Sequence, residues 1–184
     1  VKSTRKLVIN DWYKSGDYHE DHGEGLDYYK VGPSRGCGGS GIVVGKKLHT
    51  SSNFTGWKVL ANGPLRSEFE LTYDMWNAGG RKVSEIKRIA IDAGSNFSRV
   101  KSLYQSDRSG SLAVGAGIVK REGDGQFTKN ASDGWMSYWE PEVPPNGHTA
   151  CAVVIPGSGI DFTEADGNFL AVAKAEPGKP FVHY

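Results

Sequence analysis

The feature that most constrains this chain is a period-two alternation of apolar and polar residues. In residues 66–73, the apolar Phe69, Leu71 and Tyr73 alternate with polar side chains. Successive side chains of a β-strand point to opposite faces, so this pattern predicts a half-buried strand. Turn signals rich in Asn, Gly and Pro lie on both sides of it.

Strand signals of this kind recur along the rest of the chain. Residues 81–91 could mimic a helix, but they lack a cap and are rich in β-branched residues, which favours a strand. The fold class predicted is all-β, an antiparallel, supersandwich-like β-sandwich with little helix, formed by residues 1–184 as a single domain. We expect strands near residues 57–61, 66–74, 82–92, 98–105, 112–121, 149–155 and 169–174.

Two charged residues interrupt an apolar strand face. Glu85 and Lys87 share a face with Val83 and Ile89 in the segment 82–92. Charges at such positions indicate a bulge, a change of register or a polar site on the sheet surface.

Composition narrows the classes of partner and location. The net charge is +1, from 22 basic and 21 acidic residues, so we expect neither nucleic acid nor membrane as a partner. No apolar run reaches the ~20 residues of a membrane span, and no signal peptide opens this chain. A mature periplasmic or secreted protein would look the same, and we expect that location.

The ends of the chain suggest a piece of a larger protein. The sequence begins without Met and stops within an extended run at 181–184. We expect it to be the core piece of a longer protein, with strands near 7–9 and 181–184 at exposed edges or paired with each other.

One segment gathers most of the chemically active side chains. Residues 17–27 hold five carboxylates and two histidines, and their glycines indicate a loop. Crowded carboxylates repel one another unless a cation neutralises them. Three interpretations stay open: a solvated acidic loop, a divalent-cation site using His19, His22, Asp21 or Glu24, and a catalytic or substrate-binding loop.

Further candidates for substrate binding lie outside this segment. Lys30 and Arg35 either pair with its carboxylates or bind an anionic group of a substrate. The glycines at 36–41 do not precede a helix, which excludes a phosphate loop and suggests turns or close approach of a sugar. Trp135 and Trp139, in an expected aromatic loop at 134–146, either stack on a sugar ring or pack in the core. Two cysteines, Cys37 and Cys151, are expected to be either two buried thiols or, in an oxidising compartment, a disulfide.

Several stretches resemble a bacterial family known as domain of unknown function family 4861. The resemblance rests on the run Tyr-His-Glu-Asp-His-Gly-Glu-Gly-Leu-Asp at 18–27 and its continuation through 29–39, with support from 59–66, 91–96 and 117–121. It implies a role beside pectin- and ulvan-degrading enzymes. It also implies a related activity, the dehydration of a uronic acid at the non-reducing end of an oligosaccharide.

Three functional hypotheses follow. The first is a lyase for acidic oligosaccharides that eliminates water or glycoside across C4–C5 of a terminal uronic acid, with Tyr18, His19 and His22 as acid–base groups and Arg35 binding the carboxylate. The second is a non-catalytic carbohydrate-binding sandwich with a structural cation site. The third is a glycoside hydrolase that uses paired carboxylates.

Overall fold

The computed structural model describes Gly16, His19, Glu20, Asp27 and residues 29–184. The expected strand at 7–9 and the candidates Tyr18, Asp21, His22 and Glu24 lie outside the described residues. No helix in the described part is long and apolar enough to span a membrane.

The described chain consists of antiparallel strands, which confirms the all-β prediction. Each of the strands expected between residues 57 and 174 is present within a few residues of its expected bounds, the strand expected near 181–184 is present at the edge of a sheet, and shorter strands complete the sheets. The strands are β1 (Cys37–Val44), β2 (Lys47–His49), β3 (Gly56–Asn62), β4 (Arg66–Ala78), β5 (Arg81–Asp92), β6 (Arg99–Ser106), β7 (Leu112–Val119), β8 (Gln126–Asn130), β9 (Trp135–Trp139), β10 (Ala150–Val154), β11 (Asp161–Ala165), β12 (Asn168–Ala175) and β13 (Pro180–His183).

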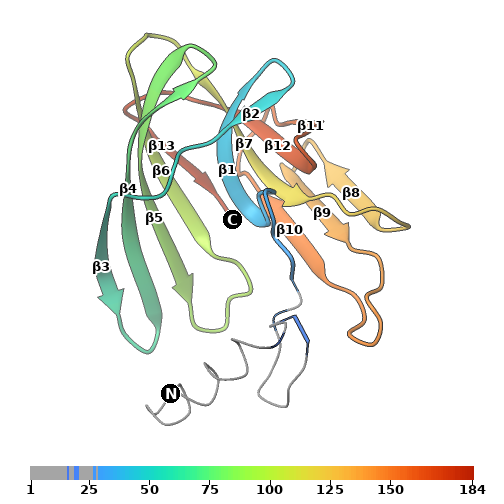
Figure 1. Cartoon of the computed structure of the whole chain (residues 1–184). Helices are drawn as coiled ribbons and strands as arrows, with labels where there is room; N and C mark the ends of the chain where they lie inside the picture. The colour runs from blue at the N-terminus through green and yellow to red at the C-terminus, as the bar shows by residue number, and fades with distance from the viewer. Residues whose placement is uncertain (1–15, 17–18, 21–26, 28) are drawn as a thin grey trace.

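These strands form three sheets that enclose one main core (Figure 1). Sheet A has the order β11-β12-β7-β1-β2, sheet B the order β13-β6-β5-β4-β3, and sheet C the order β10-β9-β8. One face of sheet A packs against sheets B and C. The main core combines β7, β12, β9, β10 and the β5–β6–β13 side of sheet B, with Val114, Ile118, Met136, Val153 and Val83 among its fully buried side chains.

The expected aromatic loop at 134–146 is wrong in its first half. Trp135–Trp139 forms β9, the middle strand of sheet C. Met136 and Tyr138 point into the core, and Trp135 and Trp139 lie on the opposite face, as period-two alternation requires. The prolines and glycine that follow produced a loop signal that masked this short strand.

The glycines at 36–41 belong to strand β1 and its entry, as the absence of a helix signal indicated. The register of β1 against β7 shifts between Cys37 and Gly39, so Gly38 is an inserted bulge residue. Its φ of 90° favours glycine, because L side chains rarely adopt that conformation. The bulge turns the Gly38 carbonyl toward His183, whose Nε2 hydrogen-bonds it at 2.8 Å.

His183 makes folding stability depend on pH. Burial lowers the pKa of its imidazole to about 4, and the Lys87 charge acts in the same direction. An unfolded His titrates near 6.5, so between these values the unfolded chain binds a proton that the folded chain does not. The stability that the folded protein gains from the neutral, buried His183 is therefore fully present above pH ~6.5. It decreases below that pH and is lost as the pH falls through 4.

We expect wild-type stability to fall by up to about 3 kcal/mol between pH 7 and pH 4 through this group. His183→Gln should be less stable at pH 7 but should lose less on acidification. Urea unfolding across this range measures both. His49→Gln, on the short edge strand β2, is the control and should keep the wild-type slope; an equal slope in His183→Gln would contradict the assignment.

Candidate functional site

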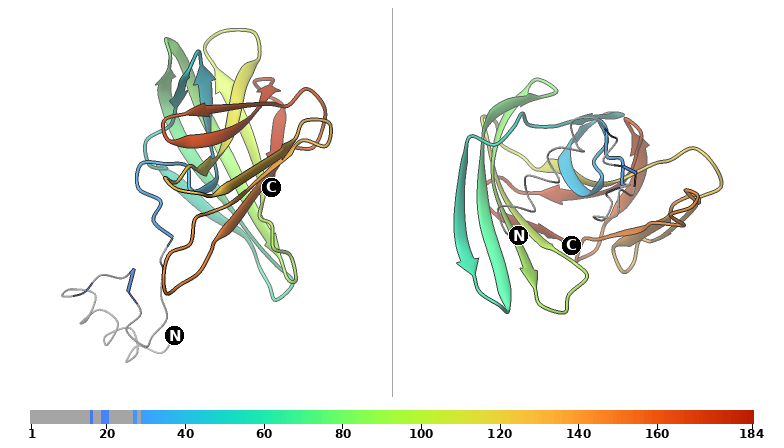
Figure 2. Two further views of the ribbon diagram at one scale, coloured as in Figure 1. Left: turned by 90° about the vertical axis from the view of Figure 1, so that its right-hand side faces the viewer. Right: turned by 60° about the horizontal axis from the view of Figure 1, so that its bottom comes forward.

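Two of the sequence-derived candidates line one pocket. A cavity of about 610 Å³ lies between the segment that precedes β1 and the turn that joins β9 to β10. Figure 2 shows this turn and the segment before β1 at the same end of the molecule. We call it the His19 pocket; the described residues that line it are His19, Glu20, Lys30, Arg121, Glu140, Val143, Pro144, Pro145 and Asn146.

Arg121 holds the two sides of this pocket together. Its Nη1 donates to the Lys30 carbonyl at 2.6 Å, and its Nε donates to Glu140 Oε2 at 3.0 Å. Its guanidinium also lies over the Tyr29 ring, 5.2 Å from the ring centroid. Sequence reasoning singled out neither Arg121 nor Glu140, although Arg121 ends one of the stretches that support the family resemblance.

Glu140 is the buried acid of the pocket. Its side chain is 6% exposed, and Oε1 has no hydrogen-bond partner among the described residues. The backbone around it is fixed, because its N–H donates to the Thr149 carbonyl at 2.8 Å and its carbonyl bonds His148 Nδ1 at 3.0 Å. A buried carboxylate oxygen without a partner is costly, so the ion pair with Arg121 is important for keeping Glu140 at this position.

The sequence-derived residues His19 and Lys30 line the same pocket as Glu140. His19 Nδ1 hydrogen-bonds the Asp27 carbonyl, and the Tyr29 N–H donates to Asp27 Oδ1 at 3.2 Å. His19 and Lys30 line a pocket that also contains Glu20 and the Arg121–Glu140 ion pair.

Arg35 does not line the His19 pocket. Its backbone N–H donates to the buried Asn168 side chain at 2.6 Å. Its own side chain lies on Gly117 of β7, where a Cβ atom would come within 2.8 Å of Arg35 Cβ. The glycine at 117 therefore makes room for Arg35.

The charges flagged on β5 form a polar row on the inner face of sheet B. Tyr73, Glu85 and Tyr104 lie opposite one another on β4, β5 and β6. Glu85 is 4% exposed, and its Oε1 lies 3.5 Å from Lys87 Nζ. Burial and Glu85 raise the pKa of Tyr104 and of Tyr73, and Arg35 partly offsets the effect on Tyr73. A bulge in the β4–β5 register, between Tyr73 and Trp76, accompanies this row.

The remaining candidates have separate positions. Trp139 is 51% exposed at the end of β9, with its ring 5.3 Å from that of His148, and Trp135 shares its face of the strand. Among the described residues, no three His, Cys, Asp or Glu side chains are grouped as metal ligands would be. The expected cation site rests mainly on residues outside that part.

The two cysteines line the same cavity beside β10. Both are free thiols, Cys37 exposed and Cys151 buried, and the Cys37 thiol lies 3.9 Å from the Ala152 carbonyl oxygen. Cys151 also lies 3.3 Å from the Tyr29 hydroxyl. Cys37 lowers the pKa of Cys151 and so does Tyr29, whereas burial acts in the opposite direction. Cys37 is the exposed thiol of the two, so it is the one that a reagent in solution meets first.

The buried Arg121–Glu140 ion pair should stabilise the fold far more than the exposed Lys120–Glu164 ion pair, which is formed by the preceding residue. Arg121→Met leaves Glu140 buried and unpaired, and we expect a loss of about 3 kcal/mol in the free energy of unfolding. Lys120→Met, which removes the exposed Lys120–Glu164 pair, should cost at most about 1 kcal/mol. Urea unfolding measures both; equal losses would refute a structural role for the buried pair.

The thiol pair should close into a disulfide on treatment with oxidised glutathione. The exposed Cys37 thiolate attacks the glutathione disulfide, and Cys151 then displaces the bound glutathione, so two reduced glutathiones leave and the protein loses two hydrogens. Mass spectrometry follows the reaction. In Cys151→Ser the glutathione adduct on Cys37 should persist; wild-type protein that accumulates the same adduct would show that the thiols cannot pair.

Comparison with known proteins places this chain among relatives of unassigned function. The profile of a family described as "Domain of unknown function (DUF4861)" matches residues 1–184. "Uncharacterized protein P7" of Formosa agariphila is 39% identical over 147 residues, which cover 77% of this chain and 36% of that protein. The chain thus spans about a third of the relative's length. No solved structure matches it. The match along its whole length shows that the chain belongs to the DUF4861 family.

Proposed function

We propose that this chain carries the acidic-sugar site of a lyase, which eliminates water or glycoside across C4–C5 of a terminal uronic acid. The observation that supports it best is the convergence of His19, Lys30 and Arg121 on one pocket. Its volume of about 610 Å³ lies within the usual range for sites of small ligands. The ligand class is an acidic oligosaccharide such as one derived from pectin or ulvan.

The residue types fit the chemistry of this elimination. The substrate carboxylate must be neutralised so that the proton on the neighbouring C5 becomes acidic enough to remove, and Lys30 supplies positive charge for this. His19 is the described residue suited to take that proton. The C5–H and C4–O bonds break, a C4=C5 double bond forms, and the leaving oxygen departs with a proton. Tyr18 and His22 remain candidates for that protonation.

Turnover and binding of a saturated uronate-ended trisaccharide test the proposal. Ultraviolet absorbance of the 4,5-unsaturated product measures turnover, and calorimetry measures binding. His19→Ala should lower kcat by about 100-fold or more, as expected for a lost acid–base group. Lys30→Gln should raise KM about tenfold through the lost charged hydrogen bond.

The matched control for Lys30→Gln is Lys46→Gln, at an exposed position in the turn between β1 and β2. It should change neither constant. Full turnover in His19→Ala would contradict the catalytic role of this residue. Unchanged KM in Lys30→Gln would place the substrate carboxylate elsewhere.

A second candidate function, carbohydrate binding without catalysis, is favoured by the outer face of sheet C. Trp135 and Trp139 lie on one side of β9, four residues apart, which corresponds to about 13 Å along a strand. Exposed aromatic rings on a flat face are suited to stacking on sugar rings. In the same calorimetric titration, a loss of affinity in Trp139→Ala with no loss in Lys30→Gln would favour this function over the lyase.

A further inference from the structure

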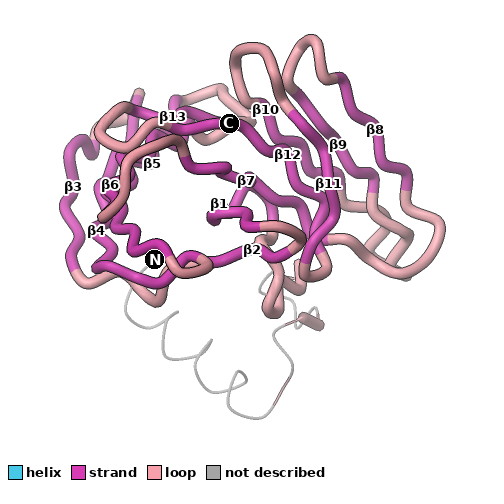
Figure 3. Tube along the Cα trace, turned by 90° about the horizontal axis from the view of Figure 1, so that it is seen from above, coloured by secondary structure: helices cyan, strands magenta, loops and turns pink. Residues whose placement is uncertain are grey.

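The inner face of sheet B carries an exposed tryptophan that the lyase proposal does not use. Residues directly opposite one another in an antiparallel sheet point to the same face. Trp57, Leu71 and Lys87 therefore form one row, which continues through Ser102 to Phe181. Phe181 belongs to the main core, so this row lies on the inner face, and Figure 3 shows sheet B curving around the side that faces β1. Trp57, on the edge strand β3, is nevertheless 70% exposed.

This inner face is closed at one end of the sheet and open at the other. Ser102 of β6 and Phe181 of β13 are buried. Val59 of β3 and Phe69 of β4, which pair with each other beside Trp57, are exposed. Neighbouring exposed apolar side chains that are rimmed by polar groups are typical of a binding surface.

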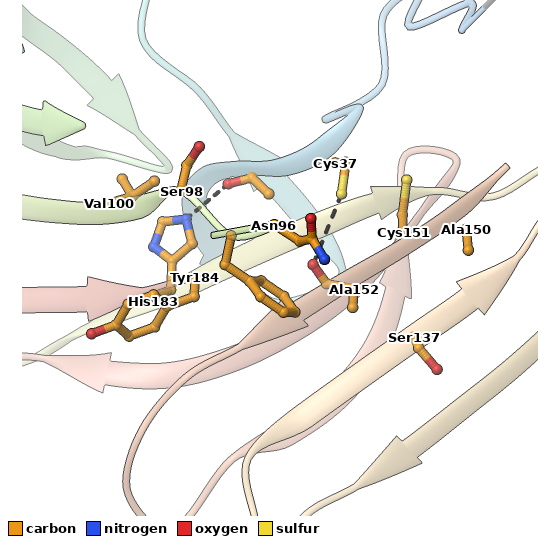
Figure 4. A pocket seen from close by; sticks show the side chains of 12 residues that line it. Cys37, Asn96, Ser98, Val100, Ser137, Ala150, Cys151, Ala152, His183 and Tyr184 are labelled. Atoms are coloured by element: carbon orange, nitrogen blue, oxygen red, sulfur yellow. Dashed lines mark hydrogen bonds between the residues drawn. The ribbon is translucent and has the colours of Figure 1, made fainter. Parts of the chain in front are cut away.

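Polar groups mark the boundary between the closed and the open part. Several polar atoms on this face have no hydrogen-bond partner among the described residues, among them Glu85 Oε1, Ser102 Oγ and His183 Nδ1. Ser102 and His183 have no exposed surface, and the dashed line at His183 in Figure 4 leaves from its other ring nitrogen. Glu85 instead adjoins the open part, because its neighbours Tyr73 and Lys87 are partly exposed.

Glu85 and Lys87 present a hydrogen-bond acceptor and a donor side by side. Glu85 Oε1 lies 3.5 Å from Lys87 Nζ, and the two side chains are 4% and 14% exposed. This separation is longer than the ~2.7–2.9 Å of a charge-assisted hydrogen bond. A ligand hydroxyl can accept from Lys87 and donate to Glu85 Oε1, which satisfies both groups. The two opposite charges cancel, so the pair offers no net charge to an anionic ligand.

We propose that the open inner face of sheet B binds a neutral oligosaccharide of at least two sugar residues. One ring would stack on the Trp57 indole, and hydroxyls of the next ring would hydrogen-bond Lys87 and Glu85. The row places Trp57 and Lys87 two strand spacings, or roughly 10 Å, apart, with the apolar Leu71 between them. This span is longer than one pyranose ring, so a monosaccharide would not reach both.

This site is separate from the His19 pocket. None of the described residues that line that pocket belongs to sheet B. The two sites also differ in the charge of their ligand, because the His19 pocket is proposed for a uronate and the Glu85–Lys87 pair suits uncharged hydroxyls. Binding of a neutral sugar here therefore does not depend on the lyase activity.

NMR titration with neutral disaccharides tests this proposal. The probes are lactose, cellobiose, maltose and xylobiose, and digalacturonate is the charged counterpart. Saturation-transfer spectra of the sugar measure affinity, and the shift of the Trp57 indole N–H, which is identified by its absence in Trp57→Phe, locates the site. At least one neutral disaccharide should bind with a millimolar Kd, and digalacturonate should bind at least about tenfold more weakly.

Two substitutions test the two halves of the site. Trp57→Ala removes the stacking platform, and Lys87→Met removes the donor; each should weaken binding by about tenfold. Trp57 is exposed, so its variant tests the proposal even if Lys87→Met fails to fold. The matched control is Lys58→Ala, the next residue on β3, which points to the outer face and should leave the affinity unchanged. Lys30→Gln should also leave it unchanged, which separates this result from the lyase proposal.

Four outcomes would overturn the proposal. The first is that no neutral disaccharide binds, and the second is that digalacturonate binds more tightly than all of them. The third is unchanged affinity in Trp57→Ala; a loss in Trp139→Ala instead would assign the sugar to the outer face of sheet C. The fourth is a dimer in analytical ultracentrifugation that Trp57→Ala abolishes, because the open face would then bind a second copy of the chain.

Discussion

The rest of the structure depends on the burial of strand β7 on both of its faces. Residues 114–119 are all buried, with Val114, Ala116 and Ile118 in the main core between the sheets. The opposite face is lined by Gly115 and Gly117, which admit Val43, Leu170 and Arg35 at close range. A central strand covered on both faces leaves little freedom to the chain that enters and leaves it, because any shift would open voids in a close-packed interior.

The fixed position of β7 also supports the His19 pocket, through Arg121. Arg121 lies two residues beyond the end of β7, and its guanidinium joins the Lys30 carbonyl to the buried Glu140 carboxylate. The segment before β1 is fixed by Arg35 and Asn168 on the other face of sheet A. The pocket walls are loop and turn residues, and the Arg121–Glu140 ion pair anchors them to the ends of β7 and β9.

Part of the site was accessible to sequence reasoning, and part was not. The density of charge at 17–27 and the basic Lys30 pointed to the segment that lines the pocket, and His19 and Lys30 do lie there. Glu85 and Lys87 broke an apolar pattern, and the structure places them in a polar row with Tyr73 and Tyr104. Arg121 and Glu140 carried no local signal, because each is an ordinary charged residue in a strand-and-turn sequence. They matter because they form an ion pair with each other, although they lie 19 residues apart in the sequence, and because both side chains are largely shielded from solvent.

The sequence by itself determined the all-β class, the positions of the long strands and the turns between them. These follow from side-chain periodicity and turn chemistry, which act over a few neighbouring residues. Only the tertiary structure decided that β9 is a strand rather than a loop, that Arg35 lies apart from the His19 pocket and that the two cysteines are neighbours. These features depend on which strands pair with one another across long stretches of chain. The packing of whole sheet faces selects that pairing, and each short segment contributes only a small part of it.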